Sequence, residues 1–444
     1  SYADRYLFQA NIRHDGSSRF AKGYRWGTFP SFSAGWVMSE EKFMKSLNWD
    51  WLSFLKLRGS WGILGNERIG DDYFPYIALM SFGNSLFYMA DGSVVSDKTA
   101  RPAILAVEDI TWETTTSTDF GLDANFFNNR LQFHFDYYWK QTKDMLLKIE
   151  IPYFMGYNNP NTNAGKMSTH GYDIELAWND RIGDLQYGVN VNFSDFLSKI
   201  DYMNDGEQIS NGKIKRAGVL FNEYYGYVCD GIYQTQEEVN NSARTSTTVT
   251  VGDLKYRDIS GPDGVPDGII SPEYDRVPLG NSLPRFQYGG TFNASYKGID
   301  FSIAFQGIGK QNSYLSTAMV QPLRDNYGSV PSIIEGKYWS PFNTAEENLS
   351  ARYPRLSNVS KSNNYATSSF WMFNGSYFRL KNLTLGYTLP ETWTQKAGID
   401  RVRFYISGSD LFCLSNFPDG WDPEMGASSY PITTSLVMGL QVNF

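Results

Sequence analysis

A short acidic stretch at residues 253–275 holds the residues best suited to bind a metal ion. The oxygen-bearing candidates are Asp258, Ser260, Asp263 and Asp267. They lie near Gly264, and calcium loops place oxygen ligands at alternate positions around a turn glycine. The spacing is imperfect, because an extra residue precedes Asp263 and no glutamate closes the loop. Ca²⁺ is therefore one hypothesis for this stretch, and an exposed turn without metal is the other.

Aromatic residues in predicted loops form a second set that could contact a ligand. The candidate substrate-binding residues are Tyr225, Trp371, Phe373 and Trp421. Aromatic rings can stack on sugar rings or pack against a partner protein, and they can equally pack within the loops themselves. The sequence leaves both roles open.

Catalytic chemistry has little support. The three histidines, His14, His134 and His170, are scattered, and no H-E-x-x-H motif, nucleophile elbow or phosphate-binding glycine loop occurs. His134 and Asp136 share one face of a predicted strand, where polar side chains are expected without any catalytic role. We therefore predict that the protein is not an enzyme.

The charge and cysteine content exclude further classes. A formal net charge of -8, from 39 basic and 47 acidic residues, leaves no basic surface for nucleic acid. Cys229 and Cys413 are too few for a disulfide framework or a zinc site, and they could pair or remain free thiols. No stretch approaches the roughly 20 consecutive apolar residues of a membrane-spanning helix.

Alternation of apolar and polar residues is the dominant pattern of the sequence and predicts β-strands. These strands form the framework that carries the candidate residues and the loops between them. Residues 131–140 place Leu, Phe, Phe, Tyr and Trp on one face and Gln, His, Asp, Tyr and Lys on the other. Similar alternation occurs at residues 55–61, 172–179, 185–194, 286–297 and 299–305. The low share of charged residues, 19%, and a mean hydropathy of -0.40 fit strands with one apolar and one polar face. Such strands cross a bilayer in about 9–11 residues, and we predict about 12 of them.

The predicted connections differ in length. Residues 128–130, 180–184 and 297–298 are predicted as tight turns, whereas residues 68–111, 201–284 and 309–376 are predicted as long loops. Short turns alternating with long loops are typical of outer-membrane barrels. The chain ends in an alternating strand that includes Leu440, Val442 and Phe444. A terminal aromatic residue in such a strand resembles an outer-membrane sorting signal, although a soluble β protein could also end in this way.

Several segments together resemble one family. They are RYLFQANIRHDGSSRFAKGYRWGTFPSFSAGWVMSEE at 5–41, LKLRGSWGILGNERIG at 55–70 and WETTTSTDFGLDANFFNNRLQFHFDYYWKQTKDML at 112–146, with further matches at 163–175, 252–280 and 380–424. These blocks resemble, in order, the SusC/RagA class of TonB-dependent transporters. The last block carries RLKNLTLGYTLP, RVRFYISGSDLF and GWDPE.

The resemblance implies an all-β fold, a transmembrane antiparallel β-barrel of 22 strands with an internal plug, in the outer membrane of a Gram-negative cell. Residues 1–444 would form the C-terminal part of the barrel, with the plug and N-terminal domains absent from this chain. Expected partners are a SusD-like surface lipoprotein acting as a lid, the TonB complex, outer-membrane lipid and an oligosaccharide or peptide cargo taken up actively. A passive porin-like channel and a secreted soluble β protein that binds glycans are the alternatives.

Overall fold

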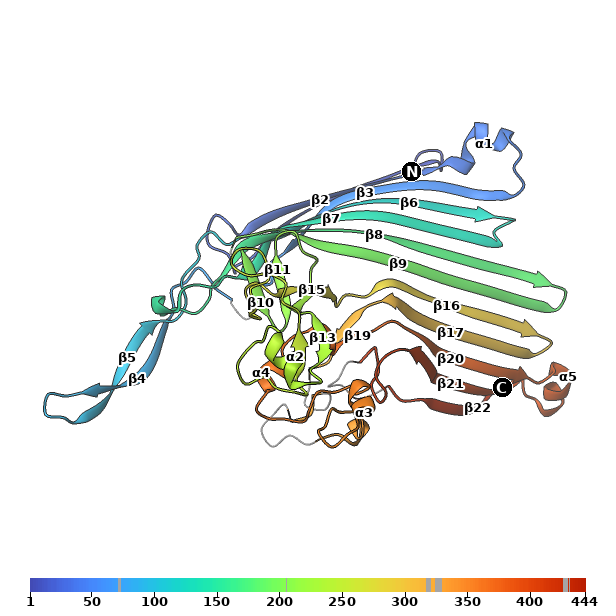
Figure 1. The fold of residues 1–444 in the computed structure, drawn as a ribbon. Helices are drawn as coiled ribbons and strands as arrows, with labels where there is room; N and C mark the ends of the chain where they lie inside the picture. The colour runs from blue at the N-terminus through green and yellow to red at the C-terminus, as the bar shows by residue number, and fades with distance from the viewer. Residues whose placement is uncertain (71–72, 205, 317–320, 324–329, 426–429, 431) are drawn as a thin grey trace. The chain divides into compact units, whose positions relative to one another are not determined.

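One antiparallel sheet dominates the computed structural model, which describes residues 1–70, 73–204, 206–316, 321–323, 330–425, 430 and 432–444 (Figure 1). Within these ranges the sheet has 12 strands in the order β1-β2-β3-β6-β7-β8-β9-β16-β17-β20-β21-β22. Their bounds are β1 Tyr6–Gly16, β2 Trp26–Val37, β3 Leu52–Asn66, β6 Glu113–Phe126, β7 Leu131–Lys148, β8 Asn161–Ile182, β9 Leu185–Met203, β16 Arg285–Tyr296, β17 Ile299–Lys310, β20 Tyr377–Thr388, β21 Arg401–Ser415 and β22 Ser435–Asn443. The predictions of an all-β fold and of about 12 strands are confirmed.

The chain divides into two compact units. The first comprises Ser1–Ile174, Phe196–Gln208 and Arg216–Leu220, and the second comprises Glu175–Asp195, Ile209–Lys215 and Phe221–Phe444. In the first unit, Phe20, Ile69, Ile110 and Trp112 form a buried cluster. In the second unit the buried side chains lie mainly in the long connections, where Tyr227, Leu254, Tyr256 and Ile270 form one cluster and Leu315, Trp371 and Phe417 another.

At one end of the strands the connections are short. Lys297 and Gly298 alone join β16 to β17, and both have positive φ, 45° and 87°, as a two-residue type I′ turn requires. Residues 127–130 join β6 to β7. The turn predicted at 180–184 is shorter than expected, since β8 continues to Ile182 and only residues 183–184 remain outside the strands. Continued strand pairing up to the turn explains this correction.

Replacing Gly298 by alanine should destabilise this hairpin. A Cβ atom there would lie 2.6 Å from the carbonyl oxygen of Thr388, whereas at Gly183, which also has positive φ, nothing lies within 4 Å. Both substitutions carry the cost of a left-handed alanine, about 1–2 kcal/mol, and only Gly298→Ala adds a clash. We expect the urea midpoint for unfolding from detergent micelles to fall further for Gly298→Ala than for Gly183→Ala. Equal midpoints would show that this contact is relieved without cost.

Most of the long connections are folded, which period-two alternation did not predict. The first holds the hairpin β4 (Met80–Tyr88) and β5 (Val94–Pro102), and η2 (Tyr153–Met155) lies between β7 and β8. The segment between β9 and β16 contains β10 Glu207–Ser210, β11 Lys213–Arg216, β12 Glu223–Tyr227, β13 Cys229–Ile232, α2 Gln236–Asn241, β14 Leu254–Tyr256 and β15 Arg276–Asn281. The segment between β17 and β20 contains β18 Asn312–Tyr314, η3 Ser332–Ile334, α3 Ala345–Leu349, α4 Lys361–Asn364, η4 Ser369–Trp371 and β19 Met372–Asn374. Apart from β4 and β5, which have nine residues each, these elements carry too few residues for a detectable period.

Short helices lie in two further connections at the end of the strands where the tight turns are. They are η1 (Met38–Glu40) and α1 (Lys42–Ser46) in the first unit, and α5 (Glu391–Thr394) and η5 (Gln395–Ala397) in the second. In the part of the chain that the structure describes, no helix combines the length and the apolar character needed to cross a membrane.

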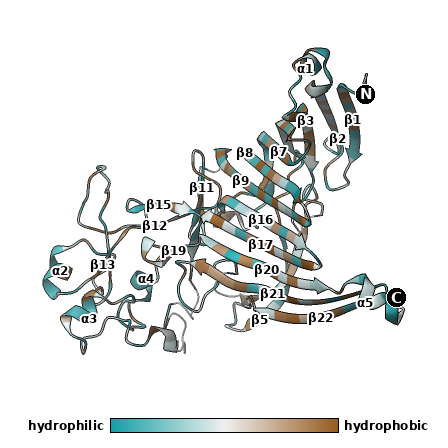
Figure 2. Cartoon of the chain, turned by 90° about the vertical axis from the view of Figure 1, so that its right-hand side faces the viewer, coloured by the Kyte–Doolittle hydropathy of each residue, from teal (hydrophilic) through white to brown (hydrophobic). Residues whose placement is uncertain are grey.

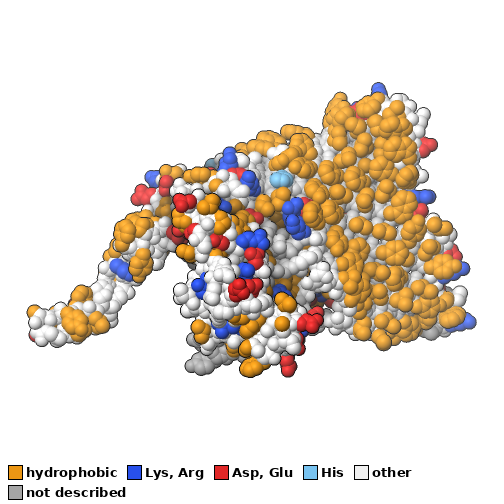
Figure 3. Space-filling view, viewed as in Figure 1, with side chains coloured by type: hydrophobic (Ala, Val, Ile, Leu, Met, Phe, Trp, Pro, Cys, Tyr) orange, Lys and Arg blue, Asp and Glu red, His pale blue; other side chains and the backbone are white. Residues whose placement is uncertain are grey.

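The register gives the sheet one apolar and one polar face. In the second unit, Val189, Phe292, Ile303 and Leu383 pair in one row across four strands. The adjacent row on the other face is Gly188, Asn293, Ser302, Thr384 and Ser407. Apolar and polar segments alternate along these strands (Figure 2), and hydrophobic side chains cover much of the surface over the strands (Figure 3).

The first unit repeats this arrangement. Trp36, Leu57, Leu122 and Phe135 form an apolar row. At its short-turn end an aromatic stack continues this face: Trp51 lies 5.3 Å from Trp49 and 5.8 Å from Phe126 between ring centroids. Such aromatic groups are typical of the level at which a bilayer meets water.

Candidate functional site

The polar face of the first unit carries a network of ion pairs, the Arg58 network. It comprises Lys56, Arg58, Asp119, Asp123, His134 and Asp136. Arg58 Nη1 lies 2.6 Å from Asp136 Oδ1, and Arg58 Nε lies 3.1 Å from Asp123 Oδ1. The guanidinium crosses β6 at Gly121, where a Cβ atom would lie 2.5 Å from Arg58 Cζ. Any side chain at this position would block the reach from β3 to β7.

His134 and Asp136 share one face of β7, as predicted, but each pairs with a residue of another strand. The imidazole Nδ1 of His134 lies 3.0 Å from Asp123 Oδ1 on the neighbouring strand, while Asp136 faces Arg58. His14 stacks on Trp26 at 4.9 Å. The structure therefore does not bring these histidines together, and each has a local structural partner or an exposed position on its strand.

A second ion-pair network, the Arg379 network, joins three segments of the second unit. It comprises Arg379, Lys381, Asp410, Asp422 and Glu424. Arg379 is only 3% exposed, with Nη2 2.6 Å from Asp422 and Nε 2.5 Å from Glu424. These residues come from the RLK, SGSD and GWDPE segments that carried part of the family resemblance. The network anchors the connection after β21 onto β20.

A third polar group, the Asp253 cluster, is buried within the long connections of the second unit. It comprises Asp253, Arg355, Ser360, Asn363 and Asn364. The carboxylate of Asp253 is 0% exposed. It accepts hydrogen bonds from Arg355 Nε at 2.7 Å, from the Ser360 hydroxyl at 2.9 Å and from Asn364 Nδ2 at 3.0 Å. Two segments about a hundred residues apart are thereby held together.

The predicted calcium candidates lie in one turn but make backbone contacts. Asp258 accepts a hydrogen bond from the Gly268 N–H at 2.7 Å, and Asp267 accepts one from the Ile269 N–H at 2.9 Å. The Ser260 hydroxyl lies 3.5 Å from the Gly261 carbonyl, and Asp263 is exposed. In the described residues no three His, Cys, Asp or Glu side chains are close enough to hold a metal ion. Binding of Ca²⁺ stays a prediction.

Asp275 organises this turn, and the sequence did not single it out. Its fully buried carboxylate accepts hydrogen bonds from the N–H groups of Ile259 and Ser271, each at 2.7 Å, and of Ser260 at 3.3 Å. Three backbone donors satisfy this carboxylate and close the loop.

The four aromatic candidates separate into two groups. Trp371, Phe373 and Trp421 belong to the cluster around Leu315 and Phe417, whereas Tyr225 belongs to β12. Trp371 is 0% exposed and donates its indole N–H to the Asn364 carbonyl at 2.7 Å, and Tyr225 is also buried. These two residues therefore pack within the protein, and substrate binding by the four aromatic residues stays a prediction. Phe373 and Trp421 are partly exposed.

The predicted sorting residues lie on the edge strand β22. Leu440 pairs with Phe404 and Val442 with Val402, while Phe444 follows the strand and is 88% exposed. Recognition of this segment by an insertion machinery stays a prediction.

Both cysteines are free. Burial raises the pKa of the Cys229 thiol to about 11, so this residue is a protonated thiol at neutral pH and a weak nucleophile. Cys413 belongs to β21, and the disulfide considered from the sequence is absent.

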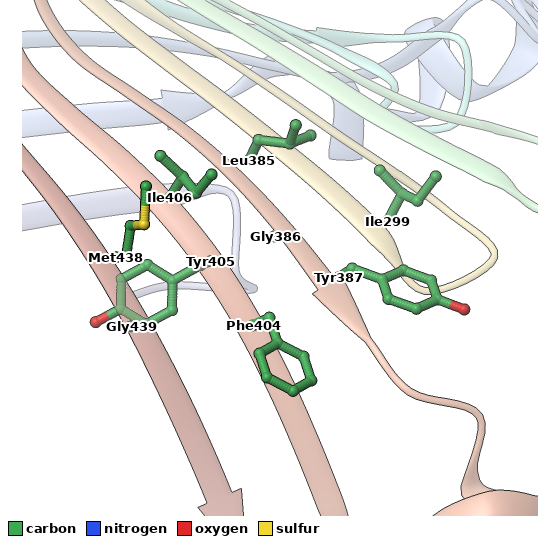
Figure 4. A pocket seen from close by; sticks show the side chains of 9 residues that line it. All are labelled: Ile299, Leu385, Gly386, Tyr387, Phe404, Tyr405, Ile406, Met438 and Gly439. Atoms are coloured by element: carbon green, nitrogen blue, oxygen red, sulfur yellow. The ribbon is translucent and has the colours of Figure 1, made fainter.

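The apolar face of the second unit has its own groove (Figure 4), with a volume of about 490 Å³. Its lining includes Ile299, Leu385, Tyr387, Phe404, Ile406 and Met438, without a charged side chain. Gly386, Tyr405 and Gly439 complete the lining. A groove of this composition suits contact with hydrocarbon, and its polar side-chain groups are the hydroxyls of Tyr387 and Tyr405.

The fold and its polar and apolar faces match a known family. A family model described as "TonB dependent receptor-like, beta-barrel" matches residues 1–407. The chain belongs to this family. Its members are outer-membrane proteins of Gram-negative bacteria, which confirms the predicted location and the transmembrane β-barrel fold.

Individual relatives agree with this assignment. TonB-dependent receptor P3 of Formosa agariphila and SusC of Bacteroides thetaiotaomicron are each 30% identical to all of this chain, which covers 44% and 43% of their lengths. The structure of the RagAB peptide transporter matches 99% of the chain and 46% of the solved chain, at 23% identity and a TM-score of 0.79. The RagAB peptide importer in its open-open state matches at 22% identity, with 100% and 46% of the two chains covered and a TM-score of 0.74. The resemblance to the SusC/RagA class is confirmed, and the chain spans less than half the length of these relatives.

Proposed function

We propose that this chain supplies part of the barrel and the structured loops of a transporter that takes up a large nutrient, energised through TonB. The observation that carries the proposal is the division of the sheet into two faces. One face is apolar and exposed, as contact with lipid requires. The other carries the Arg58 network, and both units add folded connections at the end opposite the short turns.

An oligosaccharide or a peptide is the cargo that these loops would admit. The RagAB structures are those of a peptide transporter, which supports a peptide, whereas the oligosaccharide is implied by the resemblance to the SusC/RagA class. A passive porin-like channel is the alternative that shares this architecture. The test measures uptake of a labelled oligosaccharide and of a labelled peptide by cells carrying the full-length protein, with and without a protonophore. It separates the two cargo classes and also separates active transport from a passive channel. We expect a protonophore to abolish uptake of one of the two, whereas unchanged uptake would favour the passive channel.

A surface lipoprotein of the SusD type is the proposed lid, and the hairpin β4–β5 in the first unit is the proposed contact. Pairing places Met80, Phe82, Leu86 and Tyr88 on one face, and Ser81, Ser85, Thr99 and Arg101 on the other. Phe82 is 81% exposed and Tyr88 is 84% exposed. A two-stranded hairpin is at best marginally stable alone in water, and exposed apolar faces of this kind mark interaction surfaces.

Replacing Phe82, Leu86 and Tyr88 together by serine should release the lipoprotein. Loss of interface anchors of this size costs about 2 kcal/mol or more, roughly 30-fold in affinity. The measurement is the amount of lipoprotein that co-purifies with the full-length protein from native outer membranes. The matched control replaces Ser81, Ser85 and Thr99 by alanine on the opposite face and should retain the partner. Equal retention by both variants would show that the lid docks elsewhere.

A further inference from the structure

Arg352, an exposed residue of the second unit, lies with its guanidinium against a group of aromatic rings. Its Cζ lies 4.9 Å from the ring centroid of Phe370, 5.1 Å from that of Phe373 and 5.9 Å from that of Tyr353. We call these four residues the Arg352 platform. Arginine stacks well on aromatic faces while keeping its N–H donors at the edge of the planar group.

The buried core beneath holds this platform in place. The Arg352 backbone N–H donates to the Lys337 carbonyl at 2.9 Å. The rings of Phe370 and Tyr353 pack against buried Trp371, with centroids 4.9 and 6.2 Å away, and Phe373 packs against Phe417 at 6.2 Å. A binding group held by packed neighbours loses little freedom when a ligand arrives.

Most donors of Arg352 have no protein acceptor. Among the described residues no carboxylate lies within ion-pair distance of its guanidinium, and its Nη2 makes one long hydrogen bond, 3.4 Å, to the Phe370 carbonyl. Contact with the rings removes water from one side of the group and lowers the pKa of Arg352, yet arginine remains charged at neutral pH. By contrast Arg257, also exposed, is held by Asp230 at 2.6 and 3.1 Å.

We propose that the Arg352 platform binds a carboxylate group of the transported cargo. A guanidinium can donate two parallel hydrogen bonds to a carboxylate, and the adjacent partly exposed Phe373 can contact the apolar part of the same ligand. This inference rests on the proposed transport function and specifies the chemistry of its cargo. The carboxylate could be that of an acidic sugar in an oligosaccharide or that of a peptide.

Binding of two acidic probes by the full-length protein, purified with its partner, tests the inference. The probes are an oligogalacturonate and a hexaglutamate peptide, and their neutral counterparts are a maltooligosaccharide of equal length and a hexaglutamine peptide. We expect one acidic probe to bind, and Arg352→Gln to weaken it about tenfold as a charge-assisted bidentate pair is lost. The probe that binds identifies the source of the carboxylate.

Arg257→Gln is the matched control, because it removes an exposed arginine that already has its carboxylate; it should bind the acidic probe like the unchanged protein. The inference is overturned if neither acidic probe binds, if Arg352→Gln binds unchanged, or if both variants lose binding equally. Protonophore-sensitive uptake of any cargo is scored separately. If the unchanged protein takes up a cargo in a protonophore-sensitive way but binds neither acidic probe, this inference alone is rejected. If the unchanged protein shows no protonophore-sensitive uptake of any cargo, the proposed transport function is rejected.

Discussion

Arginine in place of Ile303 is expected to prevent the protein from inserting stably into a bilayer. Ile303 lies on β17 between Phe292 of β16 and Leu383 of β20, in an apolar row with Phe301 and Phe305 two residues away on the same face. An arginine on the lipid face near the bilayer centre costs about 2–4 kcal/mol. The measurement is the free energy of unfolding of the full-length protein from lipid vesicles, taken from urea titration.

The matched control is Asn293→Arg. Asn293 is exposed on the opposite face, where it accepts a hydrogen bond from the Ser302 hydroxyl at 2.7 Å. An arginine there should remain hydrated and change the free energy of unfolding by no more than about 1 kcal/mol. If the two variants lost equal stability, the apolar row would not face lipid. If only Asn293→Arg were destabilised, the two faces would be assigned the wrong way round.

The strands were predictable because the pattern that specifies each strand lies within a few consecutive residues. Each strand repeats apolar and polar residues with a period of two, so a reader of the sequence needs no knowledge of distant residues to place Ile299, Phe301 and Ile303 on one face. The turn at Lys297 and Gly298 was equally accessible, because the two residues separate two such runs. By contrast, the strands β4 and β5 were not predicted, because the alternation of Met80, Phe82, Leu86 and Tyr88 lies within a long Gly- and Ser-rich segment.

The polar networks were not predictable, because their members come from distant segments. Arg58 meets Asp136 across a glycine of an intervening strand, and Arg379 meets Asp422 and Glu424 from another connection. The family resemblance drew attention to the segments that contain Arg379 and Asp422, but it gave no indication that they are in contact. The burial of loop side chains was not predictable either. Trp371 lies in a predicted loop, and it is buried because it packs with Leu315 and Phe417 from distant parts of the sequence.

Replacing Asp253 by asparagine should unfold much of the long connections of the second unit. The substitution leaves the partly buried guanidinium of Arg355, whose Nε lies 2.7 Å from the Asp253 carboxylate, without its negative partner. Removing one partner of a buried ion pair costs about 3–5 kcal/mol. We expect faster hydrogen exchange at residues 250–260 and 355–371 of the full-length protein in detergent, together with new protease cleavage there. The strands of the sheet should keep their protection.

Asp230→Asn is the matched control, because Asp230 pairs with Arg257 in the same unit but at the surface. An exposed pair contributes only about 0–1 kcal/mol, so exchange at the same segments should remain close to that of the unchanged protein. If both variants exchanged alike, the Asp253 cluster would not hold these segments together. Asn364 donates a hydrogen bond to Asp253, and its carbonyl accepts the indole N–H of Trp371. Accelerated exchange for Asp253→Asn alone would therefore show that the buried carboxylate of Asp253 holds Trp371 in place. The Arg352 platform, which packs against Trp371, would then depend on the same carboxylate.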